Sequence, residues 1–157
     1  MFTVKKEDNN SVRLLNFARQ YFKAAEIVFT NDPSLTPPLN QLYFHTIELL
    51  FKSFLHSKGV ETKPNHNLTK LHQQCLKNGL GGASDLQNIV SLMQSNNTGR
   101  YAFRYGTPDS TTEPATNWTR EVVAALLKSV EEVVDPTPSK PGPPVKSGLI
   151  LGKPIPK

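Results

Sequence analysis

The stretch that most constrains the fold is residues 39–58, LNQLYFHTIELLFKSFLHSK. If it is helical, its large apolar side chains occupy most of the circumference of the helix, since they cannot all share one narrow stripe. Such a helix has to be packed on several sides. Pro37 and Pro38 immediately before it favour a helix start, and Gly59 suits the left-handed conformation that often ends a helix. We therefore expect a central helix surrounded by other helices.

Apolar residues recur at steps of three and four in other segments of the chain, the spacing of one helix face. These segments are residues 11–29, 67–77, 84–93 and 116–135. No segment shows the alternation of a half-buried strand. The sequence therefore predicts an all-α, up-and-down bundle of about five helices over residues 10–135, with residues 39–58 in the middle.

The same periodicity predicts which side chains are buried. In the first helix these are Leu15, Ala18, Phe22, Ala25 and Phe29, and in the last they are Trp118, Val122, Ala125, Leu126, Val130 and Val133. Cys75 falls within the third helix and is predicted to be a core residue. His56 and His72 are predicted at the surface, and His66 is expected to cap the third helix or to bond a nearby carbonyl group.

Residues 136–157 differ in composition from the rest of the chain. They hold seven of the thirteen prolines, four lysines and no acidic residue, so we expect a disordered tail. The preceding residues contain fourteen Lys and Arg against thirteen Asp and Glu, which leaves only +1 of the net charge of +5. Most of the positive excess lies in the tail, so composition alone does not predict nucleic-acid binding.

Several classes of protein are disfavoured by what the sequence lacks. A single cysteine permits no intramolecular disulfide, and no stretch reaches the ~18 apolar residues of a membrane span. The first residues lack the apolar core of a signal peptide, so we expect a cytoplasmic protein. The spacing of His66 and His72 matches no common zinc arrangement, and phosphate-binding and dinucleotide motifs are missing. We therefore predict no metal and no other cofactor.

A polar stripe interrupts the apolar central helix. His45, Glu48 and Lys52 follow one another at steps of three and four, so they project from one side, and Glu48 precedes Lys52 in the order that favours an ion pair. In one interpretation the stripe faces a cleft, where Lys52 meets an anionic group and His45 donates a hydrogen bond or carries a proton. In the other it is a solvent-exposed ridge. If the stripe is interior, its charges must be paired.

Residues 96–115 contain too many Gly, Pro, Ser, Thr and Asp for a regular element, yet they include an aromatic and basic run. Arg100, Tyr101, Arg104 and Tyr105 combine cations with aromatic rings, which suits contact with phosphates and stacking on bases. Alternatively, the rings close one end of the bundle, while the arginines bond helix carbonyls or pair with Glu48. Both interpretations place this loop near the central helix.

Three features together resemble the HEPN domains of bacteria and archaea. They are the run YFHTIELLFKSFL at residues 43–55, the run HNLTKL at residues 66–71, and the later pair Arg100 and Tyr101. The resemblance covers residues 12–134 and implies an α-helical bundle that often forms homodimers. The functions it implies range from RNA cleavage in toxin–antitoxin and defence systems to non-catalytic binding of a nucleotide, RNA or a partner protein.

The chain departs from the catalytic members of that family. Those members carry an arginine followed by four to six residues and then a histidine, and no arginine here has a histidine at that distance. We therefore predict a binding module without catalytic residues, whose ligand site consists of His45, Glu48, Lys52, Arg100, Tyr101, Arg104 and Tyr105. The alternatives are a metal-independent ribonuclease with a non-standard set such as His45, Glu48 and Arg100, or a dimerisation or scaffold domain.

Overall fold

The computed structural model describes residues 6–62, 64, 66–97 and 115–135 of the chain. Within these residues it contains the helices α1 (Lys6–Asn31), α2 (Thr36–Ser57), α3 (Leu68–Lys77), α4 (Ser84–Asn97) and α6 (Thr116–Val134). No strand occurs in the described part of the chain. The predicted all-α, up-and-down helical bundle is therefore confirmed.

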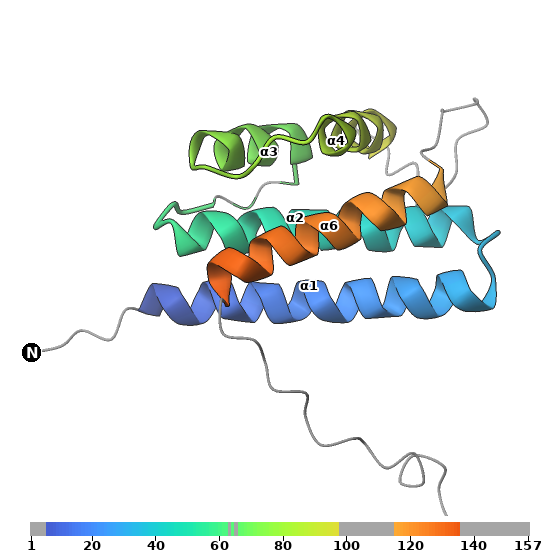
Figure 1. Ribbon diagram of the computed structural model, residues 1–157, viewed down its shortest axis with the longest axis horizontal. Coiled ribbons are helices and arrows are strands. Elements are labelled where there is room, and N and C mark those ends of the chain that lie inside the picture. Colours follow the sequence, from blue (N-terminus) through green and yellow to red (C-terminus); the bar gives the residue numbers. More distant parts are fainter. Residues whose placement is uncertain (1–5, 63, 65, 98–114, 136–157) are drawn as a thin grey trace, which may run out of the picture.

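The helices are arranged around α2, which contacts α1, α3 and α6. In Figure 1, α1 lies below α2 and α6, whereas α3 and α4 lie above them. α4 contacts α6 as well as α3, so the pair α3 and α4 is connected to the rest of the bundle through α6 as well as through α2. The middle position predicted for the apolar helix is thus the one that α2 takes.

α2 is buried along most of its length because its neighbours cover it on several sides. Two prolines occupy its first turn, where a missing N–H group costs no helix hydrogen bond. The helix begins at Thr36, slightly earlier than predicted, and ends at Ser57. Neither α2 nor any other helix among the described residues is long and apolar enough to cross a membrane. The buried apolar side chains of α2 are Leu39, Tyr43, Phe44, Ile47, Leu49, Leu50, Phe51, Phe54 and Leu55.

α2 and α3 are each followed by a glycine with a positive φ. Gly59 has a φ of 75° and Gly79 a φ of 98°. After Gly59 the chain turns back, and the N–H of Val60 donates to the carbonyl of Leu55 at 2.9 Å; the equivalent bond after Gly79 is 3.0 Å. These bonds define the Schellman motif, which requires a left-handed residue at the glycine position. The prediction that Gly59 ends the central helix is confirmed.

Replacing Gly79 with Ala is expected to lower the free energy of unfolding by about 1–2 kcal/mol, because an L-residue is strained in the left-handed region. A Cβ added at Gly79 would meet no atom within 4 Å, so crowding does not contribute. Gly81→Ala is the matched control, because its Cβ also meets nothing within 4 Å and its φ lies outside the left-handed region. Urea denaturation measures the difference, and equal stability of the two variants would contradict this role of Gly79.

The face of α6 that packs against the bundle is rotated from the predicted one. Its buried residues are Thr119, Val123, Leu126 and Val130. The prediction was wrong for Ala125 and Val133, which are exposed, and it overstated the burial of Trp118 and Val122, which are partly exposed. α6 carries apolar residues on two adjacent faces, so periodicity alone does not decide which of them turns toward α2.

His72 is buried, although it was predicted at the surface. Only 4% of the residue is exposed, and its ring stacks on Phe51 with centroids 5.3 Å apart. Burial lowers the pKa of His72 from its usual value and so favours the neutral ring. Cys75, one turn further along α3, is fully buried as predicted, and burial raises the pKa of its thiol to about 12. The apolar face of α3 therefore includes both residues.

Candidate functional site

The polar stripe of the central helix is built around a buried carboxylate. Glu48 lies near the middle of α2, and only 3% of the residue is exposed. Its neighbours in sequence, Ile47 and Leu49, both belong to the hydrophobic core. A carboxylate in such a place is stable only if other groups satisfy it.

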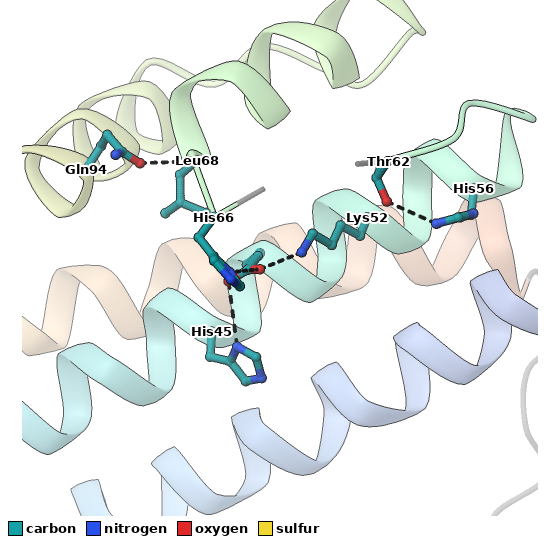
Figure 2. Close-up of polar contacts among 8 residues, drawn as sticks. His45, Lys52, His56, Thr62, His66, Leu68 and Gln94 are labelled. Atoms are coloured by element: carbon teal, nitrogen blue, oxygen red, sulfur yellow. Dashed lines mark hydrogen bonds and ion pairs between the residues drawn. The ribbon is translucent and has the colours of Figure 1, made fainter. Parts of the chain in front are cut away.

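Three side chains converge on Glu48. Lys52 Nζ lies 2.6 Å from Glu48 Oε1, and His66 Nδ1 lies 2.8 Å from the same oxygen. His45 Nδ1 lies 3.7 Å from Oε2. In Figure 2, His45 and Lys52 extend from α2, whereas His66 reaches toward them from the segment before α3. The structure therefore shows an interior, paired carboxylate at this stripe and not a solvent-exposed ridge.

These contacts change the acidity of Glu48. Burial alone raises the pKa of the carboxyl group, because it disfavours the charged form. The nearby imidazole of His45, the hydrogen bonds from Lys52 and His66, and the positive charge of Lys52 act in the opposite direction and lower the pKa to about 2. Glu48 is therefore ionised at neutral pH. An ionised carboxylate is only an acceptor, so the histidine nitrogen that bonds it carries a hydrogen.

Two hydrogen bonds hold the end of the α2–α3 connection where His66 lies. The side chain of Asn67 accepts a bond from the N–H of Lys70 at 3.1 Å and thereby caps α3. The N–H of Leu68 donates to Gln94 Oε1 of α4 at 2.8 Å. The expectation that His66 caps α3 or bonds a carbonyl was wrong, because Asn67 is the cap and His66 bonds a carboxylate of another helix.

The cluster reaches the surface through its histidines. The side chain of His66 is 73% exposed and that of His45 is 35% exposed, compared with 15% for Lys52. Tyr21 of α1 packs edge-to-face with His45, with ring centroids 4.3 Å apart. Because both histidines direct Nδ1 toward Glu48, Nε2 is the nitrogen that each can present to a ligand. In a neutral ring Nε2 accepts a hydrogen bond, and in a protonated ring it donates one, so such a surface can bind an anion or transfer a proton.

The structure brings together part of the predicted site and adds one residue to it. His45, Glu48 and Lys52 form one cluster, which His66 completes. The other predicted residues lie outside the described part of the chain, and their role stays a prediction: Arg100, Tyr101, Arg104 and Tyr105. Within the described residues, no group of three His, Cys, Asp or Glu side chains is arranged to hold a metal ion.

The fold and the cluster define an all-α bundle whose central helix carries a polar site, and a family comparison agrees with this description. The model of the HEPN domain matches residues 11–139. The chain therefore belongs to the HEPN domain family. Comparisons with curated proteins and with solved structures gave no match.

Membership of this family implies a nucleotide-related role, as a binding module or as a ribonuclease. HEPN domains often bind a nucleotide or RNA, and they often dimerise. For this chain, the homodimer, the protein partner, the cytoplasmic location and a place in a toxin–antitoxin or defence system stay predictions.

Proposed function

We propose that this chain is a non-catalytic HEPN module that binds a nucleotide or RNA at the surface formed by His45, Lys52 and His66. The observation that carries the proposal is the convergence of these three side chains on one buried carboxylate, Glu48. They come from two parts of the chain, α2 and the segment before α3. The cluster therefore depends on the tertiary fold and is more than a local pair on one helix.

The cluster contains more polar groups than a structural ion pair requires. Lys52 alone places a positive charge 2.6 Å from the carboxylate. His66 adds a second bond although 73% of its side chain is exposed, so it gains little from packing. Its bond to Glu48 restricts the imidazole ring and fixes which nitrogen faces outward. A carboxylate that orients a histidine in this way is common where the outer nitrogen has a function.

The chemistry of this surface suits a phosphorylated ligand. The Nε2–H of a protonated histidine and the ammonium group of Lys52 both donate hydrogen bonds to phosphate oxygens. Beside them, Tyr21 is 39% exposed and offers part of an aromatic ring. Aromatic rings next to cationic groups support the stacking of unpaired bases. Phosphate contact and base stacking together favour a nucleotide or single-stranded RNA over a simple anion.

His66→Ala is expected to raise the Kd for ATP, or for a short oligouridylate, about tenfold, since a hydrogen bond to a charged group contributes about 1.5 kcal/mol. Its exposure means that the fold should remain intact. Lys70→Ala is the matched control, because it removes an exposed cation from the first turn of α3, close in sequence to the cluster. Isothermal titration calorimetry measures the affinities.

Three results would contradict the proposal. They are no binding of either probe by the unaltered chain, unchanged affinity in His66→Ala, or an equal loss in Lys70→Ala. An equal loss in Lys70→Ala would indicate that the probe is attracted to positive charge in general and not to this cluster. Circular dichroism of each variant shows whether the helices are retained.

The same cluster supports a second candidate function, a metal-independent ribonuclease. His66 donates to a buried carboxylate through Nδ1, which is the arrangement in which a carboxylate orients a histidine for proton transfer. His45 provides a second imidazole at the same carboxylate. Incubating the purified chain with mixed RNA in the presence of EDTA tests this activity. Cleavage that is lost in both His45→Ala and His66→Ala would favour the enzyme over the binding module.

A further inference from the structure

A second concave site lies on another part of the bundle, between α6 and the connection from α3 to α4. It is a pocket of about 260 Å³. Its apolar wall is formed by Leu80, Leu86, Trp118, Val122 and Leu126. Trp118 and Val122 belong to the face of α6 that was predicted to be buried but stays partly exposed. The pocket therefore accounts for the second apolar face of α6.

The charges that line the pocket have one sign. Asp85 at the start of α4 and Glu121 in α6 both line it, and both are exposed. Among the described lining residues there is no Lys or Arg. An apolar segment flanked by cations fits such a pocket better than an acidic or uncharged one does.

The chain itself contains a segment with this chemistry. In residues 136–157 the large aliphatic residues cluster only at Leu149, Ile150 and Leu151. Lys146 precedes this run and Lys153 follows it, and the whole stretch from 136 to 157 has no acidic residue. The order of cation, aliphatic run and cation matches an apolar pocket with carboxylates at its edge.

The connection is long enough for this segment to reach the pocket of its own chain. Measured back along α6 from Asp135, Leu126 lies ~14 Å away and Trp118 lies ~26 Å away, at 1.5 Å per helical residue. The stretch from Asp135 to Leu149 spans up to ~43 Å at the 3.1 Å per residue of polyproline geometry. A segment tethered so closely has an effective concentration of the order of millimolar, which favours its own pocket over that of a second copy.

We propose that Leu149, Ile150 and Leu151 bind in the α6 pocket of the same chain, with Lys146 and Lys153 beside Asp85 and Glu121. The segment then covers the apolar side chains at the mouth of the pocket. A second molecule that binds this pocket has to displace it. The pocket is lined by none of the residues of the Glu48 cluster, so this inference does not rest on the proposed function.

The chain provides a direct probe, because Trp118 is its single tryptophan and lines the pocket. In the full chain, Ile150→Asp is expected to shift the emission of Trp118 to longer wavelength and to increase its quenching by acrylamide. Ile155→Asp is the matched control, since it makes the same change outside the aliphatic run. Both substitutions follow Val134, the last residue of α6, in the sequence, so neither changes a residue of the described helices.

A pair of charge reversals tests the electrostatic part. Lys146→Glu combined with Lys153→Glu is expected to increase quenching of Trp118, whereas Lys140→Glu combined with Lys157→Glu changes the net charge equally and leaves quenching unchanged. Identical emission and quenching in Ile150→Asp, Ile155→Asp and the unaltered chain would overturn the proposal. Dilution provides a further test. If the emission of the unaltered chain shifted on dilution to that of Ile150→Asp, a second copy of the chain would be the occupant of the pocket, and the proposal would be overturned.

Discussion

Replacing Phe54 with Ala is expected to lower the free energy of unfolding by about 3–5 kcal/mol. Phe54 is 1% exposed and lies in α2, the helix that contacts α1, α3 and α6. Removing its ring takes apolar surface out of the core and leaves a cavity that surrounding helices fill only in part. A loss of this size is a large fraction of the total stability of an ordinary domain.

The control for this variant is Phe17→Ala, which removes the same ring from a position in α1 that is 42% exposed. Because surface substitutions usually change stability by less than about 0.5 kcal/mol, the two variants should differ clearly. Urea denaturation followed by circular dichroism measures both. If Phe17→Ala proved as destabilising as Phe54→Ala, the result would contradict the prediction that the buried side chains of α2 contribute most to stability.

Lowering the pH is expected to remove the stabilisation that ionised Glu48 provides. Its pKa is lowered from 4.5 to about 2 in the folded chain, so its contribution is complete above pH 4.5 and is lost as the pH falls toward 2. At 1.36 kcal/mol per pKa unit, the contribution is about 3 kcal/mol. Glu48→Gln should therefore be less stable than the unaltered chain at pH 7, and the gap should narrow progressively below pH 4.5.

Other carboxyl groups also titrate in this range, so the informative quantity is the difference between the two proteins at each pH. Glu132→Gln is the control, because Glu132 is exposed on α6. It should follow the unaltered chain at every pH. A gap between Glu48→Gln and the unaltered chain that stays constant from pH 7 to pH 3 would show that the ionisation of Glu48 contributes nothing.

The sequence predicted the helices well, because their apolar residues recur with a clear period. It was less successful where a helix has more than one apolar face. In α1, Leu15, Ala18 and Ala25 are buried as predicted, but Phe22 and Phe29 are only partly buried. Which face turns inward depends on the neighbouring helices, and periodicity within one helix carries no information about them.

The sequence predicted which residues of the Glu48 cluster lie together only where they share one helix. His45, Glu48 and Lys52 are spaced by helical turns, so their proximity could be read from the sequence. His66 lies 18 residues from Glu48 and reaches it only through the path of the α2–α3 connection. For His72 the sequence did contain a signal, since it lies one turn from Leu68 and Cys75 on the apolar face of α3.

The central place of α2 has a consequence for the order in which the chain folds during synthesis. α1 and α2 are joined by residues 32–35, so they can pair as soon as residue 57 has emerged from the ribosome. α6 also contacts α2 but is synthesised only after residues 58–115. Short connections close faster and at a lower entropic cost than long ones, and uncovered apolar surface promotes aggregation. Part of the apolar surface of α2, the helix that contacts α1, α3 and α6 in the finished bundle, therefore stays uncovered in the nascent chain until α6 has been synthesised.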